Sequence, residues 1–222
     1  MYKLFYFPGN ANLAPHFVLE EIGAKFELVL VDRDRDAQRS PDYLKLNPTG
    51  RIPTLVDTGA DGSGDLVVCE TAAIITHLVD AHPEAKLAPA VGTAERARFY
   101  QWMFHLSNTV QAQAHLFFYP EQHVSAVSPD FLAAKDALFT RAQEEWGAMF
   151  GVVDRHLEGR AYLLGDTLGA ADLYLAMLTR WGRNMKTPTR TMPNLRRHAE
   201  SIFARPSVIR ALTTEGISAP YF

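Results

Sequence analysis

The strongest constraint on the fold of this chain is a stretch in which a proline stands directly before an apolar strand pattern. Residues 47–50, Asn-Pro-Thr-Gly, have the composition of a loop, and Pro53 then precedes the short apolar run 54–57. Because proline has no N–H to give to a sheet, it is tolerated only at a strand entrance or on an edge strand. A second strand pattern, 65–69, and a helical pattern, 71–81, follow after a turn. The stretch therefore predicts a loop, a proline corner, two strands and a helix, in that order.

The proline corner and the helix start offer two kinds of binding group. An X-Pro bond at a tight corner is the place where a cis peptide costs least. If the Ile52–Pro53 bond is cis, the N–H and C=O of Ile52 point away from the sheet and can pair with an extended peptide. Glu70 and Thr71 stand where the helix begins, so the free N–H groups of its first turn favour a bound carboxylate. Both features suit a peptide-like, anionic ligand.

The pattern N-P-x-G-x-I-P-x-L, followed by E-T-x-A-I, resembles the glutathione-binding half of the cytosolic glutathione transferases. The two motifs occur in this order with two strands between them, which makes the joint signal specific. The alternative interpretation is a simple turn proline at Pro53 and a solvated helix-start residue at Glu70. The resemblance implies an α/β thioredoxin-like N-terminal domain followed by an all-α C-terminal domain.

The first third of the chain has the element order of such a domain. A strand pattern at 4–7 is followed by a helical pattern with Asn12 as its candidate N-cap and Gly23 as its candidate C-cap. A second strand pattern runs from 26 to 31, and Ser40 begins a short helix. A right-handed crossover would make the first two strands parallel.

A proline-bounded segment separates the two halves. We predict a glutathione-binding domain at 1–82, a linker at 83–91 and an all-helical domain at 92–222. After the linker there is no further strand signal, and long amphipathic helical patterns cover 94–118 and 131–157.

A third helical pattern begins near Gly169 and resembles the capping box of the core helix in the second domain of the family. The family usually has Ser or Thr three residues before the aspartate, whereas this chain has Gly169 three residues before Asp172. Glycine has no side-chain oxygen, so only Asp172 reaching back to a backbone N–H is expected of the reciprocal pair.

Composition indicates an ordinary globular protein, with 47% hydrophobic and 21% charged residues. A net charge of -3 argues against nucleic acid or an anionic membrane as the main partner, and the arginine-rich interval 180–197 is interpreted as solvated helix faces rather than a phosphate site. We find no signal segment and no apolar run that could cross a bilayer. The single Cys69 fits a reducing compartment, so we expect a cytoplasmic protein. Because the eight histidines include no HxxxH pair, we expect no metal site.

The resemblance also implies ligand-binding roles, residue by residue. Glutathione is a tripeptide with a γ-glutamyl carboxylate and amine, a cysteinyl thiol and a glycyl carboxylate. Glu70 and Thr71 would hold its γ-glutamyl end, and the Ile52–Pro53 backbone would pair with its cysteinyl part. Arg51 or Arg35 would neutralise the glycyl carboxylate.

Attack on an electrophile needs the thiolate of glutathione, whereas a free thiol has a pKa of about 8.5. In the family the activating donor follows the first strand; it is Tyr or Ser in many classes and Cys in the bacterial beta class, which this N-terminus most resembles. Here the Cys position is Ala11, which cannot donate. Asn12 is the first candidate for the donor through its amide, Asn10 the second and Tyr6 the third. Alternatively, both asparagines only shape the turn and cap the helix.

The second substrate would bind against side chains of the helical domain, for which helical core is the alternative fate. The candidates are Phe104, His105, Asn108, His115 and Tyr119. The beta class also has a histidine on this helix, and its place here is Gln111.

The resemblance implies a homodimeric glutathione transferase that conjugates glutathione to an electrophilic small molecule in detoxification. One alternative is a glutathione-dependent reductase or lyase on the same fold, which the absence of a cysteine near Asn10 weakens. Another is a non-catalytic interaction module, against which the intact Pro53, Glu70 and Thr71 argue.

Overall fold

The computed structural model describes residues 1–59, 62 and 64–222. Their contacts divide the chain into two compact units. The first is Met1–Thr93 with Ile202–Tyr221, and the second is Ala94–Ser201 with Phe222. The C-terminal segment 202–221, which the sequence pattern assigns to the helical domain, thus packs with the first unit.

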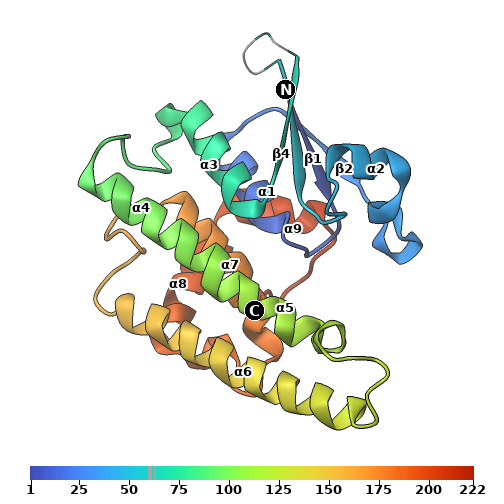
Figure 1. Cartoon of the computed structure of the whole chain (residues 1–222). Helices are drawn as coiled ribbons and strands as arrows, with labels where there is room; N and C mark the ends of the chain where they lie inside the picture. The colour runs from blue at the N-terminus through green and yellow to red at the C-terminus, as the bar shows by residue number, and fades with distance from the viewer. Residues whose placement is uncertain (60–61, 63) are drawn as a thin grey trace. The chain divides into compact units, whose positions relative to one another are not determined.

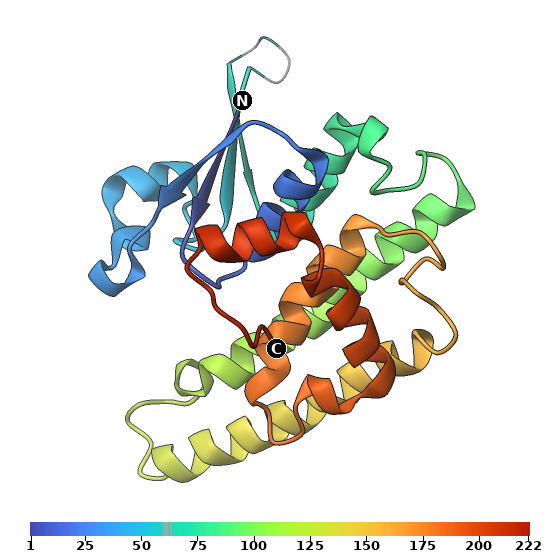
Figure 2. The ribbon, with the colours of Figure 1, turned by 180° about the vertical axis from the view of Figure 1, so that it is seen from behind.

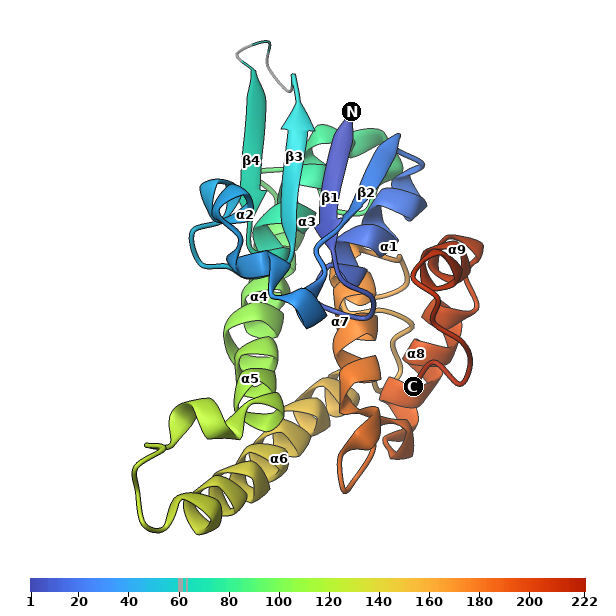
Figure 3. The same cartoon turned by 90° about the vertical axis from the view of Figure 1, so that its right-hand side faces the viewer.

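The first unit is built on a four-stranded mixed sheet in the order β2-β1-β3-β4 (Figure 3). Its strands are β1 (Tyr2–Tyr6), β2 (Phe26–Leu30), β3 (Thr54–Thr58) and β4 (Asp65–Cys69). β1 pairs with β2 in parallel and with β3 antiparallel, and β3 pairs with β4 antiparallel. This arrangement confirms the predicted thioredoxin-like layout and the parallel crossover.

Helices cover both faces of this sheet (Figure 1). They are α1 (Leu13–Ile22), α2 (Pro41–Leu46) and α3 (Thr71–Ala81). Successive side chains of a strand point to opposite faces. Accordingly, the ring of Tyr2 in β1 contacts His77 of α3, whereas the ring of Phe5 contacts Tyr43 of α2.

The two ends of α1 differ in how well the sequence pattern predicts them. Gly23 is left-handed at φ 68° and closes the helix through a bond from its N–H to the Leu19 carbonyl, which confirms the predicted C-cap. Asn12 occupies the predicted N-cap position at the other end, but its side chain makes no capping hydrogen bond. Its backbone is already helical (φ -63°, ψ -20°), and its Oδ1 accepts from the N–H of Phe7 instead.

The C-terminal helix α9 (Pro206–Thr214) lies along α1 (Figure 2). Arg210 pairs with Glu20 at 2.7 Å, and Arg205 forms an ion pair with Glu21. The ring of Phe203, just before α9, meets Phe17 edge-on. These apolar and charged contacts explain why the C-terminal segment belongs to the first unit.

The second unit is all helical. It contains α4 (Ala94–His105), α5 (Ala112–Phe118), α6 (Phe131–His156), α7 (Ala170–Trp181) and most of α8 (Pro193–Phe203). The predicted continuous helix over 94–118 contains a π-helical segment, Leu106–Gln111, between α4 and α5. Every residue from Ala170 to Thr179 is buried, so α7 forms the core of this unit.

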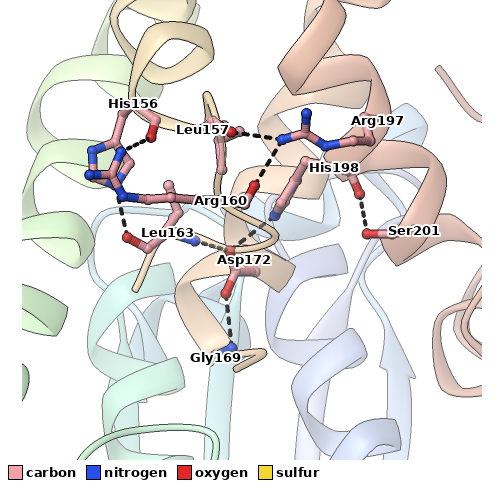
Figure 4. Close-up of polar contacts among 9 residues, drawn as sticks. All are labelled: His156, Leu157, Arg160, Leu163, Gly169, Asp172, Arg197, His198 and Ser201. Atoms are coloured by element: carbon pink, nitrogen blue, oxygen red, sulfur yellow. Dashed lines mark hydrogen bonds and ion pairs between the residues drawn. The ribbon is translucent and has the colours of Figure 1, made fainter. Parts of the chain in front are cut away.

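Asp172, at the start of α7, is a fully buried anchor of the helical unit (Figure 4). Its Oδ2 accepts from the N–H of Gly169 at 2.8 Å, which confirms the predicted half of the capping pair. Its Oδ1 accepts from the N–H of Leu163 at 2.8 Å and contacts Nε2 of His198 at 3.0 Å. One carboxylate therefore joins the segment before α7, the N-terminus of α7 and α8.

Candidate functional site

Three segments that the sequence pattern singles out meet at one end of the sheet in the first unit. Thr54, the first residue of β3, pairs with Phe5 near the end of β1 and with Cys69 at the end of β4. Consequently the turn after β1, the Ile52–Pro53 corner before β3 and Glu70 after β4 all lie at the same edge. The topology thus brings together residues that are as many as 60 positions apart.

The start of α3 is joined directly to the turn after β1. Thr71 is buried and donates from Oγ1 to the carbonyl of Ala11 at 3.4 Å. Glu70 is exposed and has φ 71° and ψ 122°, a backbone conformation that residues other than glycine rarely adopt. Such strain is concentrated at binding sites and switch regions. The positive end of α3 and its first N–H groups provide a place for an anion.

The corner before β3 leaves the backbone of Ile52 available. The Ile52–Pro53 bond is cis. The side chain of Ile52 is buried in a cluster with Val31 and Tyr43. Ile52 lies outside β3, and within the described part of the chain its N–H and C=O make no hydrogen bond. Both groups can therefore pair with an added extended peptide.

The loop before this corner is fixed by Asn47, which is 3% exposed. Its Nδ2 donates to the Arg51 carbonyl at 2.8 Å, and its Oδ1 accepts from the N–H of Thr49 at 3.1 Å. The hydroxyl of Tyr43 donates to the same Arg51 carbonyl at 2.7 Å. Gly50 is required, because it has φ 62° and a Cβ there would lie 2.8 Å from the Arg39 guanidinium.

The two asparagines in the turn between β1 and α1 have different environments. Asn12 is fully buried, and both of its amide atoms are engaged. Its Oδ1 accepts from Phe7 N at 3.1 Å, and its Nδ2 donates to Glu215 Oε1 at 2.9 Å. Asn10 is half-buried; its Oδ1 accepts from the N–H of Ala11 at 2.8 Å, and its Nδ2 makes no hydrogen bond within the described residues.

Glu215 is a residue of this site that the sequence pattern does not reveal. It follows α9, is 5% exposed, and also accepts from the N–H of Gly9 at 2.8 Å. His16 Nδ1 lies 2.7 Å from the same carboxylate. Because these contacts link residues about 200 positions apart and belong to no short motif, no local signal could have found them.

The two arginines predicted to bind a carboxylate are both exposed. Arg51 lies in the loop next to Ile52, and its carbonyl accepts from the hydroxyl of Tyr43. Arg35 lies farther along the chain from that loop and pairs with Asp32 at 3.4 Å. Arg39, which was not predicted, donates to the Thr49 carbonyl at 3.4 Å and lies over Gly50.

The substrate-binding candidates of the helical unit have different environments. Phe104 is 62% exposed and Asn108 is also exposed, one turn further along. His105 is half-buried; burial lowers its pKa, and its Nε2 has no partner within the described residues. His115 contacts His123 at 2.9 Å and stacks at an angle on Tyr119.

Asn108 lies within the π-helical segment Leu106–Gln111, and Phe104 and His105 directly precede it. π-helical turns are rare and occur frequently at functional sites. Gln111, in place of the expected histidine, accepts a hydrogen bond from the hydroxyl of the buried Tyr174. Its side chain is thus engaged within the helical unit.

The described residues hold no group of three or more His, Cys, Asp or Glu side chains placed to bind a metal ion. None of their helices combines the length and the apolar character needed to span a bilayer.

Both halves of the chain match known protein families. Residues 1–80 match the family described as Glutathione S-transferase, N-terminal domain, and residues 108–206 match Glutathione S-transferase, C-terminal domain. Over 220 residues the chain is 31% identical to Glutathione S-transferase GST-4.5 of Xanthomonas campestris, an alignment that covers 97% of this chain and 100% of the relative.

Solved structures show the same similarity. A glutathione transferase homologue from Sulfitobacter with bound glutathione aligns with a TM-score of 0.84 at 25% identity, over 98% of this chain and 99% of its own. A sphingomonad glutathione S-transferase complexed with glutathione aligns with a TM-score of 0.77 at 31% identity, over 97% and 100% of the two chains.

Proposed function

Because this chain belongs to the glutathione transferase family, we propose that it conjugates the thiolate of glutathione to an electrophilic carbon of a small molecule. The observation that carries this proposal is the convergence of the β1–α1 turn, the Ile52–Pro53 corner and the start of α3 at one end of the sheet. A tripeptide with a thiol in its middle and a carboxylate at each end matches these three segments.

The ligand would be held in three places. Glu70 and Thr71, at the positive end of α3, bind the γ-glutamyl part. The free N–H and C=O of Ile52 pair with the cysteinyl part. Arg51 neutralises the glycyl carboxylate; its exposure and its place beside Ile52 favour it over Arg35.

The thiol would be activated from the β1–α1 turn. Lowering its pKa by about two units requires about 2.7 kcal/mol. One hydrogen bond to a charged group supplies about 1.5–3 kcal/mol and a helix N-terminus about 0.3–1 kcal/mol, so a single donor together with a helix dipole is sufficient. The Nδ2 of the partly buried Asn10, which has no hydrogen-bond partner within the described residues, is the group that the contacts favour. The engaged amide of Asn12 favours a role in holding the turn.

The electrophile would bind on the helical unit. Phe104 offers exposed apolar surface and Asn108 a polar group one helical turn away. His105, His115 and Tyr119 remain proposed members of this surface.

A reductase or lyase is the less favoured function, because the β1–α1 turn has no cysteine. Cys69 ends β4, and its Sγ lies 3.8 Å from the Leu46 carbonyl. Burial, together with the charge of Glu70, raises the pKa of the Cys69 thiol, which makes it a poor nucleophile.

The experiment that tests the proposal is the ultraviolet absorbance of glutathione thiolate in the presence of the protein, followed as a function of pH. We expect an ionisation midpoint well below that of free glutathione. Binding with an unshifted midpoint, or no binding, would contradict the transferase mechanism.

We further propose a cytoplasmic homodimer that acts in detoxification, as the family resemblance implies. Sedimentation should give about twice the chain mass of 24.8 kDa. A species with the mass of one chain would contradict the dimer.

A further inference from the structure

The segment that follows α9 places one carboxylate beneath the β1–α1 turn. Glu215 Oε2 accepts from the N–H of Gly9 at 2.8 Å. Its Oε1 accepts from Asn12 Nδ2 at 2.9 Å and lies 2.7 Å from His16 Nδ1. The side chains of Glu215 and His16 are both fully buried. An ionised carboxylate is costly to bury unless several donors compensate it, and here three donors do.

The contact with His16 fixes which ring nitrogen carries hydrogen. A carboxylate can only accept, so Nδ1 of His16 must be the donor. Nε2 of His16 is buried and has no partner within the described residues. Within the described residues the ring hydrogen-bonds to Glu215 and meets the ring of Phe26 edge-on, and its position one turn into α1 ties the carboxylate to that helix.

The bonds of Glu215 reach both ends of the turn. Gly9 lies near its beginning and Asn12 at its end. Asn12 in turn accepts from Phe7 N, so a chain of hydrogen bonds runs from Glu215 through Asn12 to the end of β1. Asn10 lies between these fixed points, and within the described part of the chain its side chain makes one local hydrogen bond, from the N–H of Ala11.

We propose that Glu215 is a positioning residue for glutathione activation, acting through Gly9 and Asn12 to hold Asn10 where its amide can donate to the sulfur. This inference rests on the proposed function. It means that the catalytic turn of the N-terminal half is completed by a residue from the last eight positions of the chain. The ion pair of Arg205 with Glu21 anchors the segment that delivers this carboxylate.

The test compares Glu215→Gln with Glu20→Gln. The glutamine keeps the size of Glu215 but replaces one acceptor oxygen with an NH₂ group, so at least one of the three bonds is lost. The control breaks the pair of Glu20 with Arg210, which also joins α1 to α9 but does not touch the turn. Thiolate absorbance of bound glutathione is titrated for the wild type and both variants, with kcat and KM for glutathione.

We expect Glu215→Gln to raise the ionisation midpoint by about one pH unit, which is about a tenfold loss of thiolate below both midpoints. Its kcat should fall about as much, its KM for glutathione should stay within about twofold, and Glu20→Gln should match the wild type. A lowered wild-type midpoint that Glu215→Gln does not change would overturn the positioning role alone. A raised KM at an unchanged midpoint would also overturn it, since that pattern indicates general damage to the binding site.

Two further outcomes are an unshifted wild-type midpoint and a Glu215→Gln variant that does not fold. An unshifted wild-type midpoint overturns the proposed function and the positioning role together. If Glu215→Gln does not fold, Asn12→Ala tests the same chain of bonds from its other end, because it leaves the bonds of Glu215 to Gly9 and His16 in place. A midpoint in Asn12→Ala equal to that of the wild type would then overturn the positioning role.

Discussion

Replacement of Asn10 by alanine should raise the ionisation midpoint of bound glutathione by about one to two pH units. The magnitude follows from the contacts: Asn10 is partly buried, and its Nδ2 has no hydrogen-bond partner within the described residues. A hydrogen bond to a charged group contributes about 1.5–3 kcal/mol, and one pKa unit corresponds to 1.36 kcal/mol. The helix dipole persists in the variant and retains about 0.3–1 kcal/mol of the stabilisation.

The assay is the thiolate titration together with kcat/KM measured below both midpoints, where the loss of thiolate should appear as a ten- to hundredfold loss of rate. Asn184→Ala is the matched control, since Asn184 is an exposed asparagine of the helical unit outside the site. The free energy of unfolding of Asn10→Ala should stay within about 1 kcal/mol of the wild type, because only the local bond to the N–H of Ala11 is lost. A midpoint in Asn10→Ala within about 0.3 unit of the wild type would refute the assignment of Asn10 as the donor.

Three further outcomes concern stability. Asp172→Ala should lower the free energy of unfolding in urea by about 3–5 kcal/mol, because it leaves three donors without their buried acceptor. The control Glu200→Gln loses an exposed pair with Arg196 and should cost less than about 1 kcal/mol. A loss below about 1 kcal/mol for Asp172→Ala would contradict the anchoring role. Gly169→Ser adds a capping oxygen at a position with φ -127° and should leave the melting temperature unchanged or slightly higher, so a clear fall would count against this placement of the helix start. Burial raises the pKa of Glu21, but hydrogen bonds from Arg205 and Ser207 and the nearby arginine charges outweigh this effect, so the net pKa is lowered. The stabilisation by Glu21 is therefore present above the ordinary glutamate pKa and is lost as the pH falls through the lowered value. Glu21→Gln should accordingly lose less stability than the wild type between pH 5 and about pH 3, and a steeper loss would contradict this.

The order of the elements in the first unit could be predicted because each carries a local signal. The predicted helix 71–81 has the observed bounds, since a strand end, a helix start and an apolar period all agree there. Gly23 closes α1 as predicted because a left-handed residue is needed at that point and glycine adopts it freely. Such features depend on a few residues that are neighbours in the sequence, so the local sequence is sufficient to predict them.

Features that depend on competition between distant groups could not be predicted. Asparagine is a common N-cap residue, but the Oδ1 of Asn12 accepts from the N–H of Phe7 and its Nδ2 donates to the carboxylate of Glu215. The π-helical segment Leu106–Gln111 interrupts an apolar pattern that continues through it, so periodicity alone indicates one unbroken helix. The pairing of α9 with α1 depends on which glutamates the arginines of α9 meet, and composition shows the charges without showing the partners.

The roles of the two asparagines illustrate why a family resemblance fixes a segment more firmly than a residue. The resemblance points to the turn after β1, and it ranks Asn12 first because that position follows the lost cysteine. Our proposal reverses the ranking, because a fully buried amide with both atoms bonded would have to break a hydrogen bond to reach a ligand. An unsatisfied buried partner costs about 1–3 kcal/mol. That cost is comparable with the stabilisation that one donor gives to a thiolate, so Asn12 would gain almost nothing by turning to the sulfur. Asn10 faces no such cost, and the same bonds that remove Asn12 from direct chemistry keep the backbone around Asn10 in place.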